Sequence, residues 1–442
     1  MKREMYLTQG PILPTLIKFS LPMILGNFLQ QIYNIVDTLV VGKWIGAHAL
    51  AAVGSTYALM TFLTSIIIGL CMGSGAQFSQ LYGGQEIKKF KKNVAHSFVF
   101  IALITVLLYV LVLPSMETIT RFLQIPNEIL HMTIGYTKVI FLGLGFVFLY
   151  NFFAYFLRSV GNSMIPLYFL GASSALNIVL DIVFVTRFHY EVESTALATI
   201  ISQALSGIGL MSYSLLYMRK YLPTKEDLVF EKSMFLHIMK VDMMTSIQQS
   251  VMNFGVLMIQ GLVNSFGTII MAAFAAAVKI DTLAYMPAQE FANGYSLFIS
   301  QNFGAQKIER IKKGTKTAIL TSLLFCACIS IFVCVFARRL MLVFVDGKDI
   351  EIIQEGIRYL RIEGASYMGI GCLFLLYGYF RGIDFPSFSV VLTIVSLGTR
   401  VLFAYTFAPH TSLGVIAIWI AIPIGWALAD IIGFLKMKKR KL

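Results

Sequence analysis

Two aspartates in apolar stretches of the N-terminal half each follow an amide side chain by about one helical turn. Gln30, Asn34 and Asp37 are spaced i, i+4 and i+7. Asn177 and Asp181 are spaced i, i+4. In a helix each set lies on one face. Carboxylate and amide oxygens suit a hard cation such as Na⁺, and two close carboxylates can instead share a proton. The pattern predicts a cation or proton site, with a structural polar network as the alternative.

Other polar residues in apolar stretches extend this pattern. Thr195, Thr199 and Gln203 follow one another at intervals of four, and hydroxyl oxygens also suit a hard cation. In the C-terminal half, Lys279 and Glu290 are eleven apart on either side of Asp281, which fits either an internal ion pair or a second coupling site. We expect the following residues to line a substrate cavity: Gln30, Asn34, Gln203, Gln249, Asn253, Lys279, Asp281, Glu290 and Arg400.

The elements that position these residues must be membrane-spanning helices. The chain has 442 residues, of which 57% are hydrophobic and only 13% are charged. Soluble proteins carry roughly 25% charged residues, and about 20 apolar residues cross a bilayer as a helix. We predict twelve spans, approximately 14–42, 49–82, 94–114, 133–154, 164–186, 195–218, 235–263, 270–303, 316–345, 355–380, 387–408 and 414–435.

The basic residues indicate how the chain is oriented. Lys and Arg exceed Asp and Glu, giving a net charge of +13, and they cluster between apolar runs, as in 88–92, 307–313 and 436–441. The positive-inside rule places these clusters, and both termini, in the cytoplasm of a cell whose inner membrane holds the chain. We interpret them as topology signals and contacts for membrane lipid, and we expect no nucleic-acid partner.

An internal repeat divides the chain into two halves. Residues 79–92 (SQLYGGQEIKKFKK) and 300–313 (SQNFGAQKIERIKK) are identical at seven of fourteen positions, at an offset of 221. At the 221 offset Asp37 corresponds to Met258, and at an offset of 223 Asn177 corresponds to Arg400 and Asp181 to Ala404, so the acid pair exists only in the first half. Six spans per half give both halves the same topology, as in transporters with parallel repeats.

We therefore predict an all-α polytopic membrane protein, with twelve transmembrane helices in two pseudo-twofold-related six-helix bundles. The predicted domains are an N-terminal lobe, 1–218, a cytoplasmic linker, 219–234, and a C-terminal lobe, 235–442. We expect a monomer.

The chain resembles the multidrug and toxic compound extrusion (MATE) family, closest to its DinF-like prokaryotic branch. The resemblance covers nearly the whole chain, and five segments carry it: LPMILGNFLQQIYNIVDTLVVGKWIGAHALAAVG, GSGAQFSQLYGGQ, LRSVGNSMIP, LNIVLD and SQNFGAQ. It implies two six-helix lobes that exchange a substrate for Na⁺ or H⁺. It also implies a coupling site at Asp37, Asn177, Asp181 and Thr199, which would be the metal ligands if the ion is Na⁺. Other members use a Glu on helix seven and an Asp on helix ten, whereas here those helices offer only Asp242 and Glu363.

The sequence thus predicts an antiporter that exports organic, often cationic compounds by alternating access, with Na⁺ or H⁺ as coupling ion and no other cofactor. The alternative is a flippase for lipid-linked oligosaccharides. Such a substrate carries phosphate and needs several Lys or Arg in the cavity, where only Lys279 and Arg400 are placed for it. We predict no catalytic residues, because no HExxH, GxSxG or paired DxxxD motif is present.

Overall fold

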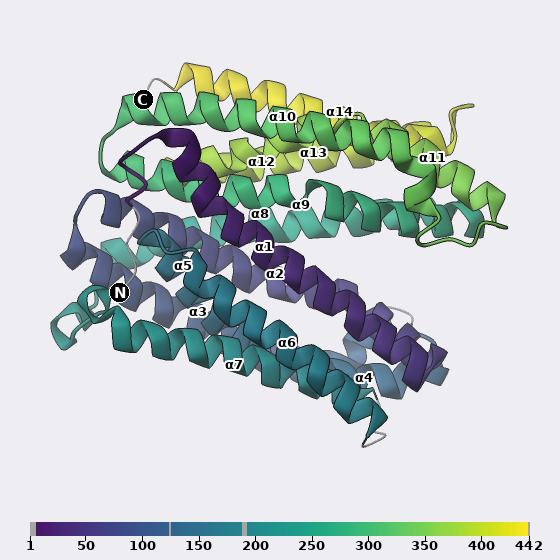
Figure 1. Ribbon diagram of the computed structural model, residues 1–442, viewed down its shortest axis with the longest axis horizontal. Helices are drawn as coiled ribbons and strands as arrows, with labels where there is room; N and C mark the ends of the chain where they lie inside the picture. Colours follow the sequence, from purple (N-terminus) through teal and green to yellow (C-terminus); the bar gives the residue numbers. More distant parts are fainter. Residues whose placement is uncertain (1–5, 123–124, 188–191, 441–442) are drawn as a thin grey trace. The chain divides into compact units, whose positions relative to one another are not determined.

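The computed structural model describes residues 6–122, 125–187 and 192–440, which form helices joined by short connections (Figure 1). The helices of the first half are α1 (Ile12–Val40), α2 (Ala47–Gly83), α3 (Ile87–Phe122), α4 (Asn127–Leu142), α5 (Leu144–Ser159), α6 (Met164–Thr186) and α7 (Glu193–Tyr217). Those of the second half are α8 (Lys232–Asn264), α9 (Thr268–Gly304), α10 (Ile308–Met341), α11 (Ile350–Gly364), α12 (Tyr367–Gly382), α13 (Pro386–Phe407) and α14 (Val415–Lys439).

The predicted spans map onto these helices in order. Two of them are broken: 133–154 corresponds to α4 and α5, which meet at Gly143, and 355–380 corresponds to α11 and α12. Within the described residues, ten helical segments are long and apolar enough to cross a membrane. The two predicted spans missing from these ten are α8 and the α11–α12 pair, in which α11 has 15 residues and α12 has 16.

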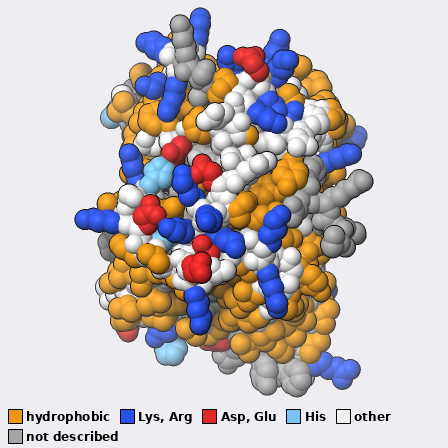
Figure 2. Space-filling model, turned by 90° about the vertical axis from the view of Figure 1, so that its left-hand side faces the viewer, with side chains coloured by type: hydrophobic (Ala, Val, Ile, Leu, Met, Phe, Trp, Pro, Cys, Tyr) orange, Lys and Arg blue, Asp and Glu red, His pale blue; other side chains and the backbone are white. Residues whose placement is uncertain are grey.

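The two halves repeat the same packing scheme. In the first half α2 packs on α5, α5 on α7, and α6 on α7. Seven helices later the same pairs recur, with α9 on α12, α12 on α14, and α13 on α14. Charged side chains gather over one end of the helices (Figure 2). Along the helices large apolar side chains are exposed, such as Leu103 and Val110 of α3 and Leu324 of α10. An apolar flank is what a bilayer requires, so the surface agrees with a membrane protein.

The structure divides into two compact units. One unit, the first unit, comprises Met1–Tyr6 and Leu25–Ser250, and the second unit comprises Leu7–Ile24 and Val251–Leu442. Helices α1 and α8 therefore each begin in one unit and end in the other. Composition revealed the polar segment 219–234, but it could not reveal a helix whose two ends pack in different units.

Small residues explain how the beginning of α8 packs inside the first unit. A Cβ added to Gly69 of α2 would lie 2.5 Å from the Cα of Ser246, and one added to Gly73 would lie 2.8 Å from the Cα of Asp242. Only glycine permits this approach of the two backbones. In the second unit, Gly294 of α9 meets Ser20 of α1 in the same manner.

Candidate cation site in the first unit

Helices α6 and α7 bring a buried amide, a carboxyl and a hydroxyl together. The one-turn spacing of Asn177 and Asp181 directs both side chains of α6 to the interior, where they are 2% and 0% exposed. Thr199 of α7 is 7% exposed, and its hydroxyl accepts a hydrogen bond from Asn177 Nδ2 at 3.4 Å. The same hydroxyl donates to the Thr195 carbonyl at 3.0 Å. Thr199 therefore fixes the Asn177 amide, which leaves the Asn177 carbonyl oxygen free to face other groups.

Helix α1 supplies the second acid. Asp37 lies in the part of α1 that belongs to the first unit, is partly buried, and interacts electrostatically with Asp181. The hydroxyls of Tyr33 on α1 and Tyr136 on α4 interact with both carboxyls. The site therefore draws on α1, α4, α6 and α7, and all of these residues lie within one unit.

The site is rich in oxygen acceptors that no protein group satisfies. Within this site, four buried oxygens have no hydrogen-bond partner in the described part of the chain: Asp37 Oδ1, Asn177 Oδ1 and both carboxyl oxygens of Asp181. Buried acceptors without a donor are costly, particularly on ionised carboxyls. A monovalent hard cation or a proton would satisfy them, and the carboxylate and amide oxygens fit either. Among the described residues, here as elsewhere, no three His, Cys, Asp or Glu side chains group as a metal site, so any cation here would rest on two carboxyls and neutral oxygens.

Comparison with known families identifies the scaffold. The MatE family model matches residues 22–183 and 243–406, which is most of the chain. The chain belongs to the MatE family.

Individual relatives of the family match this chain over most of its length. The chain is 26% identical to the probable multidrug resistance protein YoeA of Bacillus subtilis, across 93% of this chain and 90% of that protein. It is 26% identical to the multidrug export protein MepA of Staphylococcus aureus, across 84% and 82%. A solved structure of a MOP superfamily transporter from Pyrococcus furiosus is 25% identical, with a TM-score of 0.93 over 100% of this chain and 98% of that one.

Membership in the MatE family settles several of the predictions. The all-α polytopic membrane fold with twelve transmembrane helices is confirmed by the structure and by its match to solved MATE transporters. The chain is a multi-pass membrane protein and a transporter, as predicted, and not an enzyme. The choice of coupling ion and the roles of individual residues are not tested by these comparisons, so they stay predictions.

The other predicted cavity residues of this MatE chain are dispersed. Gln30 is exposed, and Asn34, Gln249 and Asn253 are partly buried. In the second unit Lys279 is exposed and lies 6.0 Å from the ring centre of Phe344, whereas Asp281 and Arg400 are buried. Glu290 accepts a hydrogen bond from Asn293 at 3.2 Å. Lys279 and Glu290 are separated by about 16 Å along α9, so the helix itself does not bring them together as the predicted ion pair requires.

Sequence reasoning missed the partners of Asp281. Glu363 of α11 and the tyrosines Tyr359 and Tyr367 interact with it inside the second unit. One signal was available: at the repeat offset of 223, Tyr136 of the first site corresponds to Tyr359. Glu363 itself has no acidic counterpart at that offset, which is why the repeat did not point to it.

Asp242 is a third buried acid, and it differs from those of the site. It is 0% exposed and accepts hydrogen bonds from Ser74 Oγ at 2.5 Å and Gln77 Nε2 at 3.3 Å. Gln77 Oε1 in turn accepts from Asn93 Nδ2 at 3.2 Å. This network satisfies Asp242 with donors from α2, so it fastens the beginning of α8 to the first unit.

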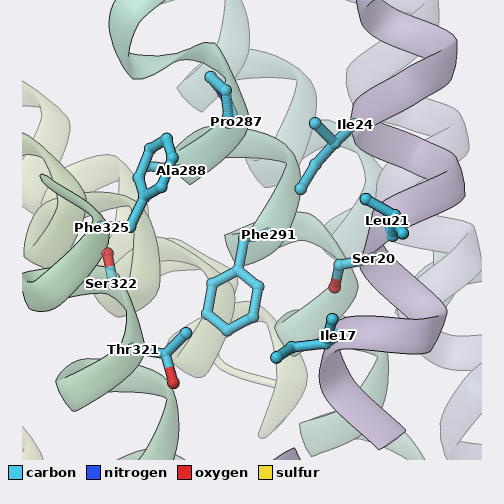
Figure 3. Close-up of a pocket in the computed structure, with 10 residues that line it drawn as sticks. All are labelled: Ile17, Ser20, Leu21, Ile24, Pro287, Ala288, Phe291, Thr321, Ser322 and Phe325. Atoms are coloured by element: carbon cyan, nitrogen blue, oxygen red, sulfur yellow. The ribbon is translucent and has the colours of Figure 1, made fainter. Parts of the chain in front are cut away.

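The second unit also contains an apolar cavity of about 150 Å³ (Figure 3). It lies between α1, α9 and α10, and ten residues line it: Ile17, Ser20, Leu21, Ile24, Pro287, Ala288, Phe291, Thr321, Ser322 and Phe325. The hydroxyls of Thr321 and Ser322 are engaged with Thr317 and Cys326, so the lining offers little polarity. None of the predicted site residues lines this cavity.

Proposed function

We propose that the chain is a secondary active antiporter that exports organic, often cationic compounds in exchange for Na⁺ or H⁺. The observation that carries the proposal is the group of unsatisfied oxygens around Asp37 and Asp181 in the first unit. Such a group binds a small cation and has no role in a passive scaffold. The names of the relatives, a multidrug export protein and a probable multidrug resistance protein, support organic compounds as substrates.

Helices α1 and α8 offer a route for coupling. Asp37 is on the part of α1 in the first unit, while the start of α1, up to Ile24, belongs to the second unit. Binding or release of an ion at Asp37 changes the charge on a helix that is covalently continuous with the other unit. In our proposal this continuity links the occupancy of the ion site to alternating access.

The proposed topology places both termini and the basic ends of the helices in the cytoplasm of a cell whose cytoplasmic membrane holds the transporter. The basic stretches at the starts of α3 and α10 support this orientation under the positive-inside rule. The substrate then moves from the cytoplasm outwards, and the coupling ion drives this export by moving inwards down its own gradient.

The experiment that tests this function is efflux of ethidium from proteoliposomes under an imposed Na⁺ or H⁺ gradient. We expect one gradient to drive efflux, and Asp37→Asn and Asp181→Asn each to reduce it to the level of empty liposomes. Asp349→Asn is a matched control, because Asp349 is exposed and lies outside the site. Wild-type efflux in both site variants would falsify the assignment of the coupling site.

A further inference from the structure

The apolar cavity of the second unit is a gap in the packing of three helices (Figure 3). Ile17 of α1, Phe291 of α9 and Thr321 of α10 point toward one another around it, and the lining side chains leave a volume of about 150 Å³. Side chains around such a volume lose dispersion contacts with one another, which destabilises the fold. A molecule that fits the cavity would restore these contacts.

The internal repeat shows how the first unit fills the corresponding position. At the offset of 221, Thr321 corresponds to Phe100 of α3, and Ser322 corresponds to Ile101. Phe100 and Ile101 are buried in the core of the first unit. The ring of Phe100 also packs edge-on against Phe235 of α8, with 5.8 Å between the ring centres. Two small hydroxyl side chains of α10 therefore stand where the first unit has two large apolar ones.

Larger side chains elsewhere in the lining do not close the cavity. Phe291 and Phe325 correspond to the smaller Leu70 and Ile104 at the same offset. Both rings line the cavity, and its volume remains with both in place. The difference between the two repeats at this position therefore lies in the small side chains of α10.

The cavity opens onto an apolar surface of the second unit. Ile17 and Leu21 line it and are 44% and 48% exposed, and Leu324, next to the lining residue Phe325, is 67% exposed. Because α1 and α10 are long and apolar enough to cross a membrane, the medium at this opening is lipid hydrocarbon. Water in a cavity needs two to four polar partners, and the Thr321 hydroxyl already donates to the Thr317 carbonyl at 2.8 Å. An acyl chain is the occupant that suits such a lining.

A basic side chain lies on the same face of α10 as Leu324, closer to the start of the helix. Lys313 precedes Leu324 by eleven residues, which is three helical turns, and it lies about 12 Å along the helix from Thr321. Lys313 is exposed and forms no ion pair among the described residues, whereas the neighbouring Lys312 pairs with Glu309 at 3.0 Å. A lysine at a membrane surface attracts anionic lipid headgroups. Its charge therefore complements the phosphate of a lipid whose chain enters the cavity.

We propose that this cavity binds one acyl chain of an anionic phospholipid, whose phosphate lies beside Lys313. The acyl chain supplies to the second unit the contacts that Phe100 and Ile101 supply to the first. The site binds its lipid whether or not the chain exports cations, so its test does not depend on the proposed function.

The test is native mass spectrometry of the full-length protein, delipidated in detergent and titrated with dioleoylphosphatidylglycerol. We expect the wild type to bind one such lipid tightly. Thr321→Phe copies Phe100 into the cavity, and excluding even two methylene groups from burial should weaken binding roughly tenfold. Ser322→Ile copies Ile101, adds less volume and should weaken binding in the same direction. Val335→Phe is the matched control, because Val335 is exposed on α10 outside the lining, and it should bind as wild type does. Wild-type affinity in both filling variants would overturn the proposal.

Lys313→Gln is the second arm, because it removes the charge and leaves the cavity intact. The wild type should bind phosphatidylglycerol about fivefold more tightly than phosphatidylcholine with the same chains, and Lys313→Gln should lose this preference. Lys348→Gln is the control, because Lys348 is exposed beyond the other end of α10, and it should keep the preference. Equal affinity of the wild type for the two lipids would contradict the proposal. Displacement of the bound lipid by ethidium would also contradict it, because the cavity would then bind exported compounds.

Discussion

The acid pair of the first unit and that of the second unit differ in the partners of their carboxyl oxygens. In the first unit, both carboxyl oxygens of Asp181 and the Asn177 carbonyl oxygen have no hydrogen-bond partner among the described residues. In the second unit, Asp281 Oδ1 accepts a hydrogen bond from the Tyr367 hydroxyl. Acceptors favour an added cation, whereas donors stabilise negative charge without one. The number of acids is therefore a poor guide to which site exchanges a metal ion.

Two pairs of repeat counterparts lie at these acid pairs, one pair alike and the other different. Tyr136 and Tyr359 are counterparts at the offset of 223, and each interacts with the acid pair of its own unit. Asn177 and Arg400 are also counterparts, but one is a neutral amide and the other a fixed cation. We interpret Arg400 as the built-in positive charge of the second unit and Asn177 as part of a site for an exchangeable one.

The largest effect is expected when the residue of the second unit is placed in the first. Asn177→Arg puts a tethered guanidinium beside Asp181, which would occupy the place of the coupling ion. We expect gradient-driven efflux to fall to the level of empty liposomes and, where Na⁺ is the coupling ion, the thermal stabilisation by added Na⁺ to disappear. A bound ion at a hundred times its dissociation constant stabilises a protein by about 2.7 kcal/mol, so the loss is measurable as a shift in Tm.

Arg400→Lys is the matched control for this change, because it keeps a positive charge in the second unit and does not alter the first. It should retain stabilisation by Na⁺ and gradient-driven efflux. If Asn177→Arg keeps Na⁺-dependent efflux, the first unit does not hold the coupling ion and the contrast between the two units fails.

Asp242 tests within the first unit whether a buried carboxyl that already accepts hydrogen bonds binds no cation. Its carboxyl already accepts from Ser74 and Gln77, so we expect it to stabilise the fold without binding an ion. Ser74→Ala removes one donor to a buried carboxyl and should lower the free energy of unfolding by about 1.5–3 kcal/mol. Thermal unfolding in detergent measures this change, and the Tm increase caused by Na⁺ should remain.

Ser55→Ala is the control for Ser74→Ala, because the Ser55 hydroxyl donates only to the Ala52 carbonyl of its own helix. Its effect should stay within about 0.5 kcal/mol. Equal effects of the two variants would mean that the Ser74–Asp242 hydrogen bond contributes nothing to stability, which contradicts its role in holding α8.

The sequence predicted which face of α6 is buried because the signals for it are local. Asn177 and Asp181 are one turn apart on α6, and helical periodicity alone puts them on one buried face. The cluster of the second unit joins residues 82 positions apart, Asp281 and Glu363, which no periodicity relates. Periodicity instead favoured Lys279 and Glu290, which lie on the same helix but too far apart along it to contact each other. Composition also could not predict that α1 and α8 each begin in one unit and end in the other, because the close backbone packing at Gly69 and Gly73 does not change the composition.

The smallest effect is expected at Thr199, which orients a ligand. Its hydroxyl donates to Thr195 and accepts from Asn177, so Thr199→Ala frees the amide to rotate. One neutral hydrogen bond contributes about 1 kcal/mol, which corresponds to roughly a fivefold weaker affinity for the ion. The Na⁺ or H⁺ concentration that gives half-maximal efflux should rise by that factor while the maximal rate is kept. Thr199→Ser retains the hydroxyl and should behave as wild type. A complete loss of transport in Thr199→Ala would instead make this hydroxyl an essential ligand of the coupling ion, and no change at all would mean that the Asn177 amide is held by other contacts.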